Sequence, residues 1–115
     1  MSTINFLEVA RKFDGKPDRF GRKRGRILEA DGFDVELYVY DAKGDWGGLH
    51  TCGKDEFFYV LKGELEIVIE GKTNILKETQ GILARVGEKH KHRALGQAWI
   101  LVFSKWPHEH IYYQQ

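Results

Sequence analysis

Glycines interrupt this chain at short and regular intervals, and that punctuation limits the folds open to it. The runs between them are rich in branched and aromatic residues, which is typical of β-strands. Strands spaced 8–12 residues apart with hairpin-length gaps predict an all-β fold, an antiparallel sandwich or small barrel, and the lack of helix–strand alternation argues against a parallel α/β fold. The predicted strands are 26–30, 34–41, 48–52, 56–61, 65–70, 73–76, 82–86, 90–95 and 99–105.

The N-terminal segment has a different period. Apolar residues such as Ile4 and Leu7 recur three or four positions apart, which predicts a short helix over 2–13, capped by Ser2 or Thr3. A chain of 115 residues is one domain's worth of sequence. We therefore expect a single domain over 1–115, with the helix and a lead-in at 1–25 and the barrel at about 26–105.

Two of the predicted strands are apolar at nearly every position. The runs 57–61 and 99–103 do not alternate as a half-buried strand does. Both of their faces must be covered, one by the barrel interior and the other by a second sheet, the helix or a partner subunit. A homodimer is the natural expectation.

Charge argues against a nucleic-acid partner. There are 18 basic and 17 acidic residues, a net charge of +1. The basic run 22–26 is interpreted as a solvated loop entering the first strand, with an anion-binding arginine near the barrel mouth as the alternative. No apolar stretch is long enough to cross a membrane, and residues 1–20 lack the apolar core of a signal peptide. The lone Cys52 fits a reducing, cytoplasmic location.

Potential metal ligands gather between Gly44 and His92. His50 and Cys52 lie two apart on one predicted strand and so share a face, and a three-residue turn brings Glu56 onto the next strand beside them. His90 and His92 share a face of a later strand. Imidazole and carboxylate groups are costly to bury, so their convergence with a thiol inside a barrel favours a metal site.

These residues resemble the cupin superfamily. The first cupin motif, G-x5-H-x-H-x3,4-E-x6-G, is matched except that a cysteine replaces the second histidine: Gly44-x5-His50-x-Cys52-x3-Glu56-x6-Gly63. The second motif, G-x5-P-x-G-x2-H-x3-N, keeps its first glycine and its histidine in the alignment Gly81-x5-Gly87-x-Lys89-x2-His92-x3-Gly96. The resemblance implies a double-stranded β-helix, or jelly-roll barrel, and covers residues from about 34 to 104.

The resemblance also implies a ligand set for one divalent transition metal, Fe, Zn, Mn or Ni. Carried over residue by residue, the ligands are His50, Glu56 and His92, with Cys52 either a fourth ligand or a buried thiol. Glu56 is the candidate catalytic residue, either as a base or as a charge-neutralising ligand. The same histidines are otherwise core residues of a barrel that has lost its metal.

A small organic ligand or substrate is expected beside the metal. Its pocket is predicted to be lined by Trp46, Phe58 and Tyr38, with His90 at the barrel mouth, or in the place of His92 if the register shifts.

A second His-x-His pair lies near the C-terminus. His108 and His110 fall outside the cupin motifs and are interpreted as solvated.

Three functions are consistent with this pattern. The first is a metal-dependent oxygenase and the second is a metal-dependent isomerase that works without O2. The third is a non-catalytic module that binds a small molecule or sugar and has a degenerate metal site. The family spans many reactions, so the barrel itself does not select among them.

Overall fold

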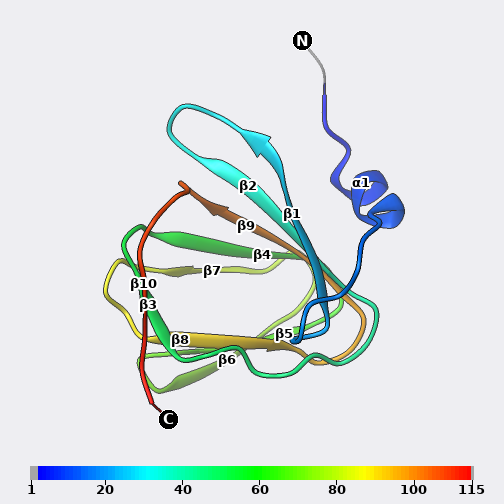
Figure 1. Cartoon of the computed structure of the whole chain (residues 1–115). Helices are drawn as coiled ribbons and strands as arrows, with labels where there is room; N and C mark the ends of the chain where they lie inside the picture. Colours follow the sequence, from blue (N-terminus) through cyan, green and yellow to red (C-terminus); the bar gives the residue numbers. More distant parts are fainter. Residues whose placement is uncertain (1–2, 115) are drawn as a thin grey trace.

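The computed structural model describes residues 3–114, which form ten strands and one short helix (Figure 1). The elements are α1 (Phe6–Lys12), β1 (Arg22–Glu29), β2 (Asp34–Tyr40), β3 (His50–Cys52), β4 (Glu56–Lys62), β5 (Leu65–Ile69), β6 (Lys72–Leu76), β7 (Gly81–Ala84), β8 (His90–Ala94), β9 (Ala98–Ser104) and β10 (His110–Tyr112).

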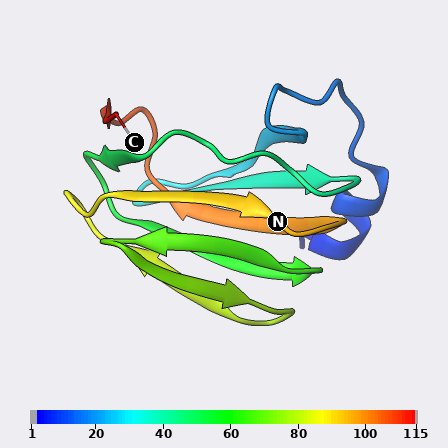
Figure 2. The same ribbon diagram turned by 90° about the horizontal axis from the view of Figure 1, so that it is seen from below.

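The strands form two antiparallel sheets of five, in the orders β1-β2-β9-β4-β7 and β10-β3-β8-β5-β6. The two sheets face each other as layers (Figure 2). The chain crosses repeatedly between them, because β3, β5 and β8 lie in one sheet and β4, β7 and β9 in the other. This confirms the predicted jelly-roll barrel.

The barrel interior is the larger of two apolar clusters. It contains fully buried residues from both sheets, including Phe58, Leu65, Ile67 and Ile100. Burying a side chain of this size contributes roughly 1.5–3 kcal/mol relative to leaving it exposed. The interior therefore holds the two sheets together.

The second apolar cluster lies on the outer face of β2 and β9. There Leu37, Leu101 and Trp99 pack beneath Ala10 of α1. The expectation that the apolar strand 99–103 is covered on both faces is confirmed for this part of the sheet, and the cover is the N-terminal helix.

The helix is shorter than predicted. It begins after Asn5, whose side chain accepts a hydrogen bond from the Glu8 amide at 3.1 Å, as an N-cap residue does. Thr3 precedes the helix, and the predicted start at Ser2 lies outside the described residues. No helix in the 3–114 range is long and apolar enough to cross a membrane.

The basic run forms a strand instead of a solvated loop. β1 begins at Arg22, four residues before the predicted start, and pairs with β2 from Arg22↔Tyr40 to Glu29↔Asp34. The Arg22 and Arg24 guanidiniums lie over the Tyr38 ring, 4.5 and 5.3 Å from its centroid. Stacking on a ring and pairing with nearby carboxylates allow arginines to occupy a strand that charge alone makes improbable.

Two motif glycines are required by close backbone approach. A Cβ atom at Gly44 would lie 2.8 Å from the Phe20 carbonyl oxygen. Gly63 has a φ of +80°, and a Cβ atom there would overlap the Gln97 carbonyl oxygen. Glycine is therefore needed at both positions for the fold itself, independently of any ligand.

Candidate metal centre

Three strands bring four potential ligands to one end of the barrel. His50 on β3 lies directly opposite His90 on β8, Cys52 follows on the same face of β3, and Glu56 is the first residue of β4. The ligand atoms of these four residues all lie within 4.8 Å of one another. Strand alternation and the Cys52–Glu56 turn thus produce the convergence that the sequence predicts.

Glu56 is the centre of this group and is 4 % exposed. Its Oε1 lies 3.1 Å from His90 Nε2 and accepts a hydrogen bond from the Cys52 thiol at 3.2 Å. His90 is 1 % exposed and is therefore buried within the barrel, not at its mouth as expected.

The two histidines of this group are held in one tautomer by backbone carbonyls. His50 Nδ1 donates to the Gly48 carbonyl at 2.8 Å, and His90 Nδ1 donates to the Glu88 carbonyl at 3.1 Å. A carbonyl only accepts, so Nδ1 of each ring carries a proton, and Nε2 is left to bind either a second proton or a metal ion. This second-sphere bonding is typical of histidines that ligate metals.

Burial and local charge shift the pKa values of these residues in different directions. Burial alone would raise the pKa of Glu56, but hydrogen bonds from His90 and Cys52 and the charges of His90 and His108 outweigh it, so the pKa falls to about 2. Burial and the Glu56 carboxylate raise the pKa of Cys52. Burial lowers the pKa of His50. An ionised carboxylate therefore lies beside a protonated thiol, and the pKa of the neighbouring His50 favours its neutral form.

His92, the histidine expected from motif spacing, is not brought into this group. It lies two residues further along β8, where its ring stacks on Tyr38 at 5.9 Å and lies 5.1 Å from Phe58. Burial and the Arg22 charge lower its pKa to about 3. His92 Nδ1 is buried and has no hydrogen-bond partner among the described residues.

A sequence signal for His90 does exist. Shifted two residues earlier, the G-x2-H part of the second cupin motif is met by Gly87-x2-His90, and Gly87 has a φ of +81°. The first motif glycine then falls on Thr79, which itself has a φ of +68°. The glycine at position 81 made the other alignment more attractive in the sequence.

The predicted pocket residues divide between the inside and the outside of the barrel. Tyr38 and Phe58 are buried beside His92, as expected. Trp46 instead packs against side chains of the outer face of β8, with Arg93 4.5 Å from its ring centroid.

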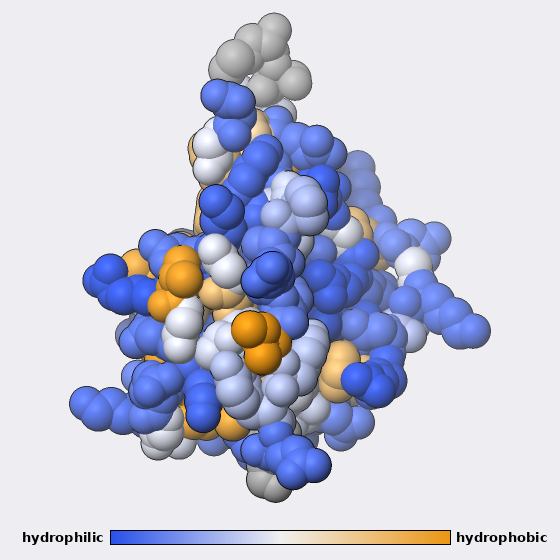
Figure 3. Space-filling view, turned by 60° about the vertical axis from the view of Figure 1, so that its left-hand side comes forward, coloured by the Kyte–Doolittle hydropathy of each residue, from blue (hydrophilic) through white to orange (hydrophobic). Residues whose placement is uncertain are grey.

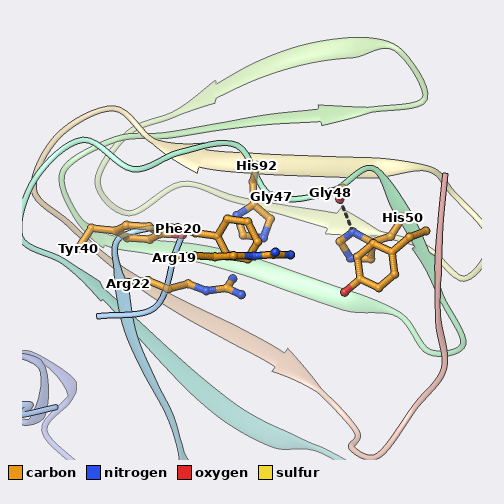
Figure 4. Close-up of a pocket in the computed structure, with 9 residues that line it drawn as sticks. Arg19, Phe20, Arg22, Tyr40, Gly47, Gly48, His50 and His92 are labelled. Carbon is orange, nitrogen blue, oxygen red and sulfur yellow. Dashed lines mark hydrogen bonds between the residues drawn. The ribbon is translucent and has the colours of Figure 1, made fainter. Parts of the chain in front are cut away.

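Two small cavities adjoin the candidate metal centre. The inner one, of about 80 Å³, touches Glu56, and the outer one, of about 120 Å³, is lined by Arg19 and Phe20. Arg22, His50, His92 and Tyr112 line both. Figure 4 shows the outer cavity, in which the Arg19 and Arg22 side chains both extend in the direction of His92 and His50.

The C-terminal tail also reaches the centre. Its strand β10 was not predicted, because it is three residues long and exposed and so has no alternating pattern. β10 pairs with β3, and its link to β9 places His108 Nε2 3.5 Å from Glu56 Oε2. The surface on the β3 and β10 side is mostly hydrophilic, with separate apolar spots (Figure 3).

Comparison with known proteins agrees with this architecture. The sequence profile of the cupin domain matches residues 37–104. Among proteins with curated descriptions, no significant match to the chain was found.

Several solved structures share the fold. A conserved protein of unknown function from Streptococcus pyogenes is 18 % identical over 92 % of this chain and 88 % of its own, with a TM-score of 0.71. A cupin-2 domain protein from Shewanella frigidimarina is 21 % identical over 87 % and 91 %, with a TM-score of 0.68. Salicylate 1,2-dioxygenase from Pseudoaminobacter salicylatoxidans, solved with gentisate, is 15 % identical over 95 % of this chain but 33 % of its own, with a TM-score of 0.75. The profile match spans more than half of the residues, and this chain belongs to the cupin domain family.

Proposed function

We propose that this protein is a small metal-dependent cupin whose ion is held by His50, Glu56 and His90, with Cys52 as a fourth donor. The observation that carries the proposal is the fixed orientation of the two imidazoles. With both Nδ1 atoms bonded to carbonyls, His90 directs an Nε2 lone pair at the Glu56 carboxylate, 3.1 Å away. Two acceptors at that distance need a cation between or beside them, either a proton or a metal ion.

The donor set favours a transition metal over Mg²⁺ or Ca²⁺. Two imidazoles, one carboxylate and a thiol suit Fe²⁺ or Zn²⁺, whereas the harder cations prefer oxygen ligands. Thiolate binding requires Cys52 to lose its proton, so uptake of the ion is expected to release protons. The pKa of about 2 favours Glu56 as a charge-neutralising ligand over a catalytic base.

The cavities favour a small anionic organic ligand. Arg22 lines both of them, and Arg19 lies at the outer one. His92 Nδ1, which has no protein partner among residues 3–114, is available to a polar group of the ligand. A carboxylate near Arg22 and a neighbouring oxygen near Glu56 would match this arrangement of charge.

Oxygenase-type or isomerase-type chemistry fits such a site. A bound ion would supply Lewis acidity and open positions for an oxygen-bearing substrate. Arg22 would hold the anionic end of that substrate, and Phe58 and Tyr38 would exclude water from it. The fold shared with a dioxygenase supports the oxygenase type. A protein that binds ligands but does not turn them over is the alternative.

Metal analysis of matched variants tests the ligand set. We expect about one or more equivalents of Fe or Zn in protein purified without chelators, measured by plasma mass spectrometry. His90→Ala should lose most of this metal, whereas His92→Ala, altered on the same face of the same strand, should keep it. The reverse result would restore the ligand set expected from motif spacing, and a metal-free wild type would overturn the proposal.

Turnover assays separate the candidate activities. The iron-loaded protein is tested for O2 uptake with small hydroxy acids, catechols and enediols, and the zinc-loaded protein for isomerisation under anaerobic conditions. Oxygen consumption that is lost in Arg22→Ala would support the oxygenase type. Saturable ligand binding without turnover in either assay would favour the binding module.

We also propose that the protein forms a homodimer. Phe33, Phe57 and Val86 are 44, 38 and 57 % exposed and line one groove with Phe103, on the part of the first sheet that α1 does not cover. A second copy of this surface would cover the apolar groups. Light scattering should give twice 13.4 kDa, about 27 kDa, and Phe57→Lys should give the monomer mass. A wild-type monomer at micromolar concentration would refute the dimer.

A further inference from the structure

The C-terminal tail carries a second group of potential metal ligands. His108 and His110 come from the segment between β9 and the end of the chain, outside the strands that carry the cupin motifs. Their ligand atoms and those of Cys52 and Glu56 all lie within 4.8 Å of one another. This group shares two residues with the first group and has its own two histidines.

His108 is prepared for a cation in the same way as His50 and His90. Its side chain is 1 % exposed, and its Nδ1 donates to the Lys105 carbonyl at 2.7 Å. With Nδ1 bonded to this carbonyl, His108 Nε2 lies 3.5 Å from Glu56 Oε2 and 3.0 Å from His110 Nε2. Three potential ligand atoms, from Glu56, His108 and His110, are thus brought together.

Several independent contacts hold the tail in this position. The buried Asp34 carboxylate accepts hydrogen bonds from the Trp106 amide at 3.1 Å and Lys105 Nζ at 3.2 Å. The Gly53 amide donates to the Glu109 carbonyl at 2.8 Å, and His110 pairs with Cys52 in the β10–β3 ladder. The approach of the two histidines to Glu56 is therefore built into the fold of the tail.

The Glu56 carboxylate has one oxygen for each group. Oε1 lies beside His90 and Cys52, whereas Oε2 lies beside His108. A carboxylate used in this way bridges two ions, as in two-metal sites whose ions are roughly 3.5–4 Å apart.

We propose that the tail completes a second metal site, formed by His108, His110, Glu56 and Cys52, so that the barrel holds a pair of ions bridged by Glu56. The inference rests on the proposed function, because the first ion is the one assigned to His50 and His90. The outer site would take a borderline divalent ion such as Zn²⁺ or Co²⁺, which imidazole and thiolate ligands favour.

The two sites should differ in affinity and exchange rate. His90 is buried, whereas His110 is exposed at the surface end of the second group. Water can replace a ligand more easily at the exposed site, so we expect the inner site to fill first and the outer site to release its ion first.

Titration of the metal-free full chain with Co²⁺ tests the inference. We expect two equivalents in the wild type, bound in two phases and followed by calorimetry and by the thiolate–cobalt absorption of Cys52. His108→Ala combined with His110→Ala should bind one equivalent. Glu109→Ala, which changes an exposed residue between the two histidines, should still bind two.

The outcomes separate the two proposals. One equivalent in the wild type, lost in His50→Ala, overturns the second site and leaves the first intact. No binding in the wild type overturns both. If the double variant fails to fold by circular dichroism, His110→Ala replaces it, because this residue is exposed. We then expect the second phase to weaken by at least about 10-fold, and an unchanged second phase overturns the outer site.

Discussion

The two sheets of this barrel are built for different purposes. β2 and β9 pair without interruption from Asp34↔Ser104 to Tyr40↔Ala98, and each has a single residue that is not fully buried. β3 has three residues and pairs with β8 at one position, His50↔His90. Nevertheless, β3, β8 and β10 carry four of the six potential ligands, whereas Glu56 comes from β4 of the first sheet and His108 from the link to β10. The long strands supply the stability, and the short strands are free to present polar side chains.

The largest effect should come from the long strands. Leu37 on β2 is fully buried beneath α1, so Leu37→Ala is expected to reduce the free energy of unfolding by about 2–5 kcal/mol. Thermal melting should then fall by more than about 8 °C. His50→Ala, on β3, should cost less than about 1 kcal/mol in metal-free protein. An equal loss of unfolding free energy in the two variants would contradict the view that the long strands supply most of the stability.

Metal affinity should show the opposite pattern. Glu56→Gln keeps the shape of the side chain but removes the charge, and we expect Zn²⁺ affinity to fall by more than about 100-fold. Glu66→Gln is the matched control, because Glu66 pairs with Arg93 away from the barrel interior. Competition with a chromogenic chelator measures both. A similar affinity in the two variants would remove Glu56 from the ligand set.

Acid should weaken the metal-free barrel through the same carboxylate. The pKa of Glu56 is lowered from 4.5 to about 2 in the folded protein, so its contribution is fully present above pH 4.5 and is lost as the pH falls through about 2. Urea unfolding of chelator-treated protein should therefore show a steeper loss of stability between pH 5 and pH 3 in the wild type than in Glu56→Gln. Parallel curves would contradict the lowered pKa.

How well the sequence predicted each part depends on how local its determinants are. The strand series and the positions of His50, Cys52 and Glu56 follow from alternation and one short turn, and the structure places them as expected. The choice between His90 and His92 depends on which residue of β8 lies opposite His50, and this pairing between strands far apart in the sequence is not given by the hydrophobic pattern.

The position of the tail could not be predicted from local sequence patterns. β10 is an exposed three-residue strand, and the approach of His108 to Glu56 depends on the distant Asp34, which holds the tail in place. The strand formed by the basic run likewise depends on Tyr38, a residue of another strand. These contacts between remote segments leave no periodic signal in the sequence.

The smallest expected effect lies within the second sheet. The amides of β10 should exchange with solvent through local opening at a cost well below the global free energy of unfolding, whereas those of β9 should require global unfolding. Hydrogen–deuterium exchange followed by mass spectrometry measures both. Equal protection of the β10 and β9 amides would show that the tail opens only when the whole protein unfolds.

The tail acts as a tethered pair of imidazoles. Because His108 and His110 are joined to β9 by a few residues, they meet Glu56 at a local concentration on the order of millimolar or above, set by the tether and not by the amount of protein. Free imidazole is used at far higher concentrations to elute proteins from nickel columns. It would then compete with His108 and His110 for coordination positions on the proposed outer ion. Preparations made in that way would lose ions from the exposed end of the barrel first.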